Sequence, residues 1–316
     1  MSGSETSGSG ERSRTTVVVA TRNRADELAT TLHHLTRLRP PPPVIVVDNA
    51  SSDGTADVVR RAAEEGADVR SIPLSRNEGA AARNRGVWAA ETEFVAFADD
   101  DSWWERAALT TAERILDVHP DIALVAARTV VGPECRDDPV NAALHVSPLA
   151  SGSADVDDPG PPVLGFLACA AIVRRRAFLA IGGFSPVLQF GGEETLLAFD
   201  LVAAGHRVVH VCDVIAHHHP STRRMATIAR RNLESRNAVL TALMRRPVGE
   251  CVRSVTTLVA RALVDPRVTP ALVGAALRAP TALWHRQTLP PDVERAARAL
   301  ETTPAASGHP DEEVRA

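Results

Sequence analysis

The sequence predicts an α/β fold, Rossmann-like, with a mostly parallel central sheet and helices on both faces. Short runs of β-branched and apolar residues alternate with segments of helical periodicity over roughly the first hundred residues. This alternation indicates strand–helix–strand units, whose strands pair in parallel and are buried by the helices. Prolines, glycines and polar turns separate the segments, so the elements can be assigned in order.

The predicted elements begin with the strand TTVVVAT at residue 15. Leu28, Leu32, Leu35 and Leu38 then recur at helical spacing, and the prolines that follow end this helix because proline cannot continue it. The second strand, VIVVD, leads into the polar turn NASSDGT and a helix with Gly66 near its end. A short strand (VRSIPLS), a loop that enters a helix (NEGAAARNRGVWAAE) and a fourth strand (FVAFADDD) complete the series.

Composition limits the class of protein. The 316 residues are 44% hydrophobic, enough for one large domain or two small ones, and the net charge of -4 argues against binding nucleic acid. Cys135, Cys169, Cys212 and Cys251 form no CxxC pair, so we expect reduced, mostly buried thiols. No apolar run is long enough to span a bilayer and no signal-peptide pattern is present, which together predict a cytoplasmic location.

Two tails and a C-terminal region flank the predicted catalytic part. Residues 1–14 and 303–316 are polar and rich in small residues, so we expect disorder there. The Pro/Asp-rich stretch 131–162 predicts a mobile loop for an acceptor. Residues 249–302 predict two or three amphipathic helices, which would pack on the catalytic part, dimerise or touch the inner face of a membrane.

A strongly basic helix is predicted just before that region. Its arginines are Arg223, Arg224, Arg230, Arg231 and Arg236. They favour a solvated face paired with acids, a clamp on a diphosphate, or a patch on anionic lipid, and the pattern does not decide among these.

Four polar segments, TRNR, DNASSD, RNEG and ADDD, follow predicted strands. Ligands of such sheets bind beyond the carboxyl ends of the strands, so these segments predict one shared site. The dinucleotide motif GxGxxG and the P-loop are both missing. Clustered carboxylates at a strand end are suited to Mg²⁺ or Mn²⁺ with substrate phosphate oxygens completing the shell.

These segments, in order and spacing, resemble the nucleotide-sugar half of an inverting family 2 glycosyltransferase with the GT-A fold. The strings that carry the resemblance are VVVATRNR, VIVVDNASSDGT, NEGAAARNRG and FADDD, then FLACAAIVRRRAFLAIGGFSP, GGEETLLAFDLVAAGHRV and HHHPS. It covers about residues 15–246. It implies a catalytic domain over 15–222, divided into a nucleotide-sugar half (15–102) and an acceptor half (103–222), followed by a helical region over 223–302.

The resemblance also assigns residues to the donor. Asp48 is placed at the nucleotide base, and Arg83 near the ribose and base. The full set that it implies for the nucleotide sugar is Thr21, Arg24, Asp48, Asn49, Asp53, Asn77, Arg83, Asp99 and Asp100. For Asp53 a turn-forming role, and for Asn77 a conformational role, remain open beside the binding role.

A divalent metal, Mn²⁺ or Mg²⁺, and a general base complete the implied site. The resemblance places Asp99 and Asp101 at the metal, with His217 the first and His219 the second histidine candidate. It places the base at Glu194, where the family's usual residue is Asp. A first-turn position favoured by the helix dipole would equally explain two acids here.

The resemblance therefore implies metal-dependent, inverting transfer of a sugar from a nucleotide-diphosphate sugar to an acceptor hydroxyl. It leaves the acceptor open among a glycan, a lipid-linked molecule and a small molecule, as in polysaccharide, glycolipid or secondary-metabolite synthesis. Two alternatives remain, a sugar nucleotidyltransferase and a catalytically silent binding module. A basic phosphate-binding loop would favour the first, and TRNRADE is a poor candidate for one. One tryptophan of the pair Trp103 and Trp104 is expected to pack, and the other is left open as a wall for a sugar.

Overall fold

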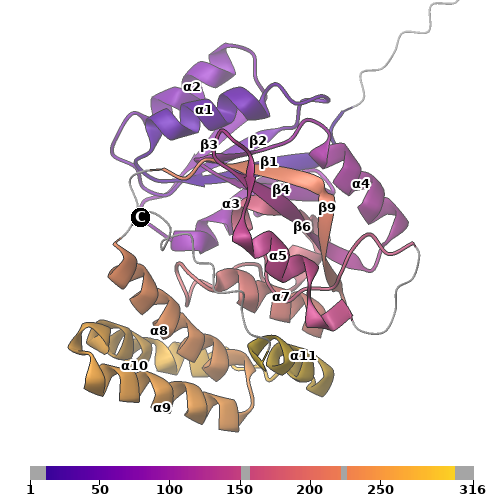
Figure 1. The fold of residues 1–316 in the computed structure, drawn as a ribbon. Coiled ribbons are helices and arrows are strands. Elements are labelled where there is room, and N and C mark those ends of the chain that lie inside the picture. Colours follow the sequence, from indigo (N-terminus) through magenta and orange to yellow (C-terminus); the bar gives the residue numbers. More distant parts are fainter. Residues whose placement is uncertain (1–11, 151–156, 222–225, 303–316) are drawn as a thin grey trace, which may run out of the picture.

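The structure is a computed structural model that describes residues 12–150, 157–221 and 226–302 (Figure 1). Most of the predicted N-terminal tail, the whole C-terminal tail, Arg223 and Arg224 lie outside the described residues. The predicted α/β class is confirmed. A nine-stranded sheet carries helices on both faces, and helices from the last third of the chain gather beside it.

The first four strands form a parallel half-sheet in the order β3-β2-β1-β4. The strands β2, β1 and β4 are mostly apolar and buried because helices cover both of their faces. Each connection contains a helix, as a crossover between parallel strands requires. The bounds are Thr15–Thr21 for β1, Val44–Asp48 for β2, Val69–Pro73 for β3 and Phe94–Asp99 for β4.

The second half of the sheet is mixed. β8 runs antiparallel to β4 and β6, β6 and β9 are parallel, and β5 is antiparallel to β9 at the edge. Asp100 and Asp101 form the turn between β4 and β5, here called the aspartate turn. Because β5 begins directly after Asp101 and pairs with β9, this turn lies beside the end of β9. The bounds are Ser102–Trp104 for β5, Ile122–Val131 for β6, Arg136–Asp137 for β7, Ala171–Arg174 for β8 and Arg207–His218 for β9.

Two layers of helices bury the sheet. On one face α1, α2 and α4 supply apolar side chains, including Leu28, Leu32 and Leu35 at the predicted helical spacing. On the other face α3, α5, α6 and α7 do so. The bounds are Ala25–Leu35 for α1, Thr55–Glu64 for α2, Arg83–Ala89 for α3 (after a short 3₁₀ turn, Gly79–Ala82), Ala108–Val118 for α4, Pro139–His145 for α5, Arg175–Ala180 for α6 and Glu193–Ala203 for α7.

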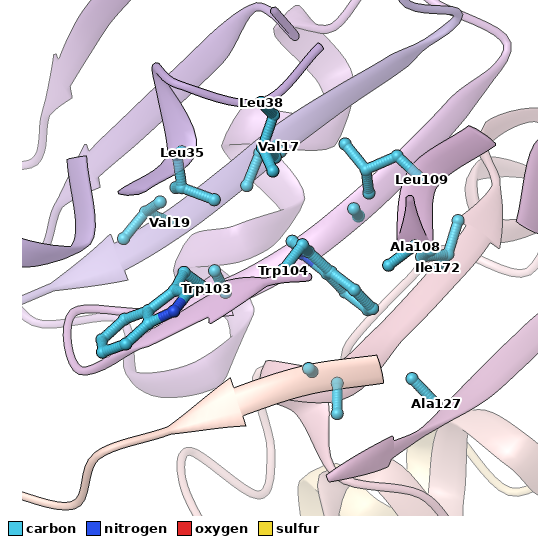
Figure 2. Close-up of a cluster of buried hydrophobic side chains, with 14 of the residues drawn as sticks. Val17, Val19, Leu35, Leu38, Trp103, Trp104, Ala108, Leu109, Ala127 and Ile172 are labelled. Atoms are coloured by element: carbon cyan, nitrogen blue, oxygen red, sulfur yellow. The ribbon is translucent and has the colours of Figure 1, made fainter. Parts of the chain in front are cut away.

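Both tryptophans of β5 belong to the core (Figure 2). Trp103 is 8% exposed and Trp104 is 2% exposed. Figure 2 shows Trp104 near Ala108 and Ile172, and Trp103 on the side nearer Val19. The packing role expected for one tryptophan therefore applies to both.

The stretch predicted as a mobile acceptor loop is largely ordered structure, so that prediction is wrong for residues 131–150. It holds β7, α5 and a 3₁₀ turn, Pro148–Ala150. Asp138 caps α5 by accepting a hydrogen bond from the Val140 amide at 2.9 Å. Asn141 pairs with both backbone groups of Thr129, at 3.0 and 2.7 Å, and so ties α5 to the sheet.

The C-terminal region is a group of helices that packs on the part of the chain that holds the sheet (Figure 1). Its bounds are Thr227–Arg245 for α8, Val248–Val264 for α9, Thr269–Trp284 for α10 and Pro291–Thr302 for α11, so residues 249–302 hold three helices. Arg245 of α8 donates to Asp200 of α7, and the buried Arg246 donates to Glu294 of α11 at 2.7 Å. No helix among the described residues is both long and apolar enough to cross a membrane.

The cysteines differ from the expectation in part. All four thiols are free, as predicted. Cys169 and Cys251 are buried, whereas Cys135 and Cys212 are exposed on the β7 turn and on β9.

Candidate functional site

Three parallel strands end at one edge and set up the site. Thr21 at the end of β1 is in register with Asp48 at the end of β2. On its other side β1 pairs Ala20 with Asp99 at the end of β4. The polar residues predicted to converge therefore lie on neighbouring strands at the carboxyl edge, where ligands of such sheets bind.

Asp100 points into the protein. Its carboxylate accepts a hydrogen bond from the Thr21 hydroxyl at 2.9 Å and one from the Arg24 guanidinium at 3.1 Å. Its carbonyl accepts from Thr31 of α1 at 2.8 Å. Burial raises the pKa of Asp100 to about 7, against the opposing effect of Arg24. Asp100 is therefore engaged with the protein rather than open to a ligand.

Asp101 faces the end of β9. One carboxylate oxygen, Oδ2, accepts from Arg24 at 3.2 Å and from the Ser221 amide at 3.0 Å. The other, Oδ1, lies 3.6 Å from Nε2 of His218. Nδ1 of His218 is buried without a hydrogen-bond partner. The His218 Nε2 and the Asp101 Oδ1 are thus two neighbouring atoms of the kinds that bind metal ions.

The two histidines that the sequence favoured lie elsewhere. Nε2 of His217 bonds to Glu105 at 2.8 Å. The His219 ring is 4.4 Å from the Trp103 ring, and its backbone amide donates to the Asp101 carbonyl at 2.8 Å. Trp103 also stacks on His34 of α1, with ring centroids 4.0 Å apart. The structure therefore brings His218, not the side chains of His217 and His219, to the Asp101 carboxylate.

Several predicted donor residues use their side chains to shape turns. Asp48 accepts from the Ser51 amide at 2.8 Å. Asp53 accepts from Thr55 at 3.0 Å and from the Ala25 amide at 3.2 Å, so it stabilises the starts of α2 and α1.

Asn49 and Asn77 act in the same way on the turn that leads to α3. Asn49 accepts from the Glu78 amide at 2.7 Å and donates to the Gly79 carbonyl at 3.1 Å. Asn77 accepts from the Gly79 amide at 2.9 Å. Both asparagines therefore hold the turn that leads to α3, a conformational role of the kind left open for Asn77.

Arg83 links the aspartates to the acidic pair of α7. It is buried, donates to the Asp99 carboxylate and lies 5.9 Å from the Phe184 ring. The pKa of Glu194 is raised to about 8, first by burial and then by the Glu193 carboxylate, while Arg83 opposes the rise. Oε2 of Glu193 is buried without a partner. A strongly perturbed carboxyl pair opposite a strand-end acid is typical of a functional site.

The side chains near Asp101 fit a divalent cation only in part. Among residues 12–150, 157–221 and 226–302, no group of three or more His, Cys, Asp or Glu side chains is arranged to hold a metal ion. The Asp101 carboxylate and the His218 imidazole, whose Nε2 faces that carboxylate, are suitable ligand types for Mn²⁺. These protein side chains therefore fit part of the coordination shell of a divalent cation, and phosphate oxygens of a bound ligand would complete it.

His218 is a candidate site residue that sequence reasoning missed. Adjacent residues of a strand point to opposite faces, so within HHH only alternate histidines share a face. The choice of face depends on the pairing of Ser102 with His218 and of Trp103 with His217. The sequence alone predicts that His218 faces away from His217 and His219, but it does not show which of the two faces lies toward Asp101.

Comparison with known proteins gives a consistent picture. The profile described as Glycosyl transferase family 2 matches residues 16–182. The "Pre-mycofactocin glycosyltransferase" of Mycobacterium tuberculosis is 35% identical over 224 residues, which are 68% of this chain and 45% of that protein. The chain thus spans less than half the length of this curated relative.

Solved structures share the fold. The mannosyltransferase PcManGT from Pyrobaculum calidifontis, in complex with GDP-Man and Mn²⁺, superposes with a TM-score of 0.58 at 24% identity. The match covers 95% of this chain and 77% of that one. Staphylococcus aureus TarS 1–349 in complex with UDP-GlcNAc gives a TM-score of 0.54 at 18% identity, over 72% of this chain and 66% of that one.

Proposed function

This chain belongs to glycosyl transferase family 2, and from that premise we propose that it transfers a sugar from a nucleotide-diphosphate sugar to an acceptor hydroxyl, with inversion and with a divalent metal. The observation that carries the proposal is the convergence at one sheet edge of Asp48, Asp99 and Asp101, with Arg83 between Asp99 and the Glu193–Glu194 pair. A displacement at the anomeric carbon needs acids that hold the leaving diphosphate on one side of the sugar and a carboxylate base on the other side.

The donor is assigned to the edge formed by β1, β2 and β4. Asp48 has one carboxylate oxygen engaged by the Ser51 amide, and we assign its other oxygen to the nucleotide base. Asn49, Asp53 and Asn77 shape the turns around it. We keep the division into a nucleotide-sugar half over 15–102 and an acceptor half over 103–222, since the acidic pair lies in the second segment.

The metal is assigned to Asp101 and His218, and Asp99, whose carboxylate accepts a hydrogen bond from Arg83, is assigned to the ribose of the donor. His218 replaces His217 and His219 in this assignment because its Nε2 is the imidazole nitrogen beside Asp101. Arg24 bridges Asp100 and Asp101 and so holds the aspartate turn in place. When bound, the cation would neutralise charge on the leaving diphosphate. The Mn²⁺ named with PcManGT supports a divalent ion of this kind.

The general base is assigned to Glu194. It would accept the proton of the acceptor hydroxyl as that oxygen attacks the anomeric carbon. Burial raises its pKa, which makes the ionised carboxylate a stronger base once it forms. The Arg83 guanidinium opposes part of that rise.

The C-terminal helices are proposed to bring the enzyme to a lipid-linked acceptor at a membrane surface. Leu263, Leu277 and Trp284 are 82%, 75% and 87% exposed on α9 and α10. Exposed tryptophan and leucine side chains suit the interface of a bilayer. Flotation with vesicles of phosphatidylglycerol and phosphatidylcholine tests this, with Trp284→Ser and Leu277→Ser expected to reduce binding.

A thermal-shift and hydrolysis experiment tests the core proposal. UDP, GDP, UDP-GlcNAc and GDP-Man are each added with and without Mn²⁺, and release of nucleoside diphosphate is followed with water as acceptor. We expect at least one nucleotide to stabilise the protein more with Mn²⁺ than without, and Glu194→Gln to abolish release. Release of pyrophosphate from a nucleoside triphosphate and a sugar 1-phosphate would instead identify a nucleotidyltransferase. Binding without release or transfer would identify a silent module.

A further inference from the structure

The segment that leads into α7 adopts an uncommon backbone. It runs from Leu188 to Gly192 and ends at the acidic pair. Gln189, Gly191 and Gly192 all have positive φ angles, of 67°, 88° and 84°. For Gln189, which has a side chain, this region is strained, and such strain persists only where surrounding contacts enforce it.

The carbonyl groups of this segment are held from outside it. Asn237 of α8 places Nδ2 3.1 Å from the Leu188 oxygen, 2.8 Å from the Phe190 oxygen and 2.5 Å from the Gly191 oxygen, so its two N–H groups are shared among three acceptors. Arg236 donates to the Leu188 oxygen at 2.6 Å. The Gln189 oxygen accepts from the Ala80 amide at 2.6 Å. Four successive carbonyls are thus oriented by α8 and by the turn before α3.

Arg236 and Asn237 form a fixed unit. Asn237 is fully buried and Arg236 is 6% exposed. Nε of Arg236 donates to Oδ1 of Asn237 at 2.9 Å, which directs the asparagine's Nδ2 toward the carbonyls. A Cβ on Gly274 of α10 would come within 2.9 Å of the Arg236 side chain, so glycine makes room for it. Within the described part of the chain Arg236 has no ion pair, and its charge is met by hydrogen bonds to neutral groups.

We propose that Arg236 and Asn237 are positioning residues that hold the start of α7, and with it Glu194, at a fixed place relative to the nucleotide-sugar half. This inference rests on the proposed role of Glu194 as base. The hydrogen bond of Ala80 to Gln189 connects the same segment to the turn that Asn49 fixes. The C-terminal helices are therefore part of the catalytic arrangement, through the segment 188–192.

The experiment compares two asparagines of one helix. Asn237→Ala removes the donor to the segment, whereas Asn232→Ala removes an asparagine that donates to the Arg267 carbonyl at 2.7 Å, away from the segment. The probe is release of nucleoside diphosphate from GDP-Man or UDP-GlcNAc with Mn²⁺ and water as acceptor. We expect kcat to fall at least about tenfold in Asn237→Ala, since small displacements of catalytic groups are costly. Binding of GDP or UDP should stay unchanged, and Asn232→Ala should match the wild type.

A pH profile separates positioning from general loosening. If Glu194 leaves its buried place in Asn237→Ala, the acid limb of the kcat profile moves to lower pH, whereas loss of folded protein lowers the profile without moving it. Should Asn237→Ala fail to fold, Arg236→Lys, which keeps a cation near Leu188 but loses the bond to Asn237, gives the same comparison. The inference would be overturned if Asn237→Ala and Arg236→Lys had the same kcat as Asn232→Ala and an acid limb at the same pH. Full activity in Glu194→Gln would instead overturn the proposed base.

Discussion

Nε2 of His218, at the end of β9, lies 3.6 Å from Oδ1 of Asp101, in the turn just before the antiparallel strand β5. The contact joins the turn after β4 to the end of β9, two segments far apart in the sequence. Its two atoms are also the ones that we assign to the cation, so the histidine tract supplies a matched pair of variants.

His218→Ala should weaken Mn²⁺-dependent nucleotide binding by at least about tenfold, because it removes one proposed ligand. His217→Ala should leave it close to wild type, since that side chain bonds to Glu105 instead. The measurement is the Mn²⁺ concentration that gives half of the thermal shift with GDP or UDP. Equal effects of the two variants would refute the assignment to His218.

Asp100 and Asp101 should respond differently to replacement by asparagine. With its pKa near 7, Asp100 is partly protonated at neutral pH, so Asp100→Asn changes little charge and should cost about 1 kcal/mol or less of stability. It should keep Mn²⁺-dependent nucleotide binding. Asp101→Asn should lose that binding while unfolding at a similar temperature. Chemical denaturation and the same thermal-shift titration check both outcomes, and loss of binding in Asp100→Asn would contradict the inward role of its carboxylate.

The rate of donor breakdown should rise with pH through the pKa of Glu194. A base acts only when ionised, so below a pKa of about 8 the rate should fall about tenfold per pH unit. A plateau down to pH 6 would argue against Glu194 as the base.

The same shift predicts a change in stability. Because the folded state raises this pKa, the unfolded carboxyl ionises first, and stability is lost as the pH rises from about 4.5 to about 8. Glu194→Gln cannot ionise and should escape this loss. Its melting temperature should therefore exceed that of the wild type increasingly toward pH 8, which a calorimetric series measures. A pH-independent difference would contradict the buried, perturbed state of Glu194.

Gly79 should tolerate alanine less than Gly66 does, although both have positive φ angles. A Cβ at Gly79 would lie 2.2 Å from the Gln189 oxygen, whereas a Cβ at Gly66 would meet no atom within 4 Å. Gly66→Ala should cost about 1 kcal/mol from the backbone alone, and Gly79→Ala clearly more. Urea denaturation of the two variants measures the difference. An equal loss of unfolding free energy in the two variants would contradict a tight contact between the turn at Gly79 and the segment 188–192.

The sequence was most informative where periodicity and strand ends decide the structure. Apolar runs placed β1, β2 and β4, and their polar ends placed Asp48 and Asp99 on one edge, because side-chain period and chain direction are local properties. The region 131–150 was misread because Asp138 and Asn141, which resemble loop residues, act there as a helix cap and a partner for Thr129. The hydrogen bonds of Asn237 to the segment 188–192 join residues that are distant in the sequence, so no local pattern predicts them.

The pairing of β5 with β9 also explains what three successive histidines can offer. A shift of one residue between strands normally exchanges the face on which every side chain lies. Here Ser102 is opposite His218, and a shift in either direction would place His217 or His219 there. The repeated residue thus makes the chemistry at this position insensitive to a one-residue insertion or deletion in the neighbouring strand, a form of tolerance that a single histidine would lack.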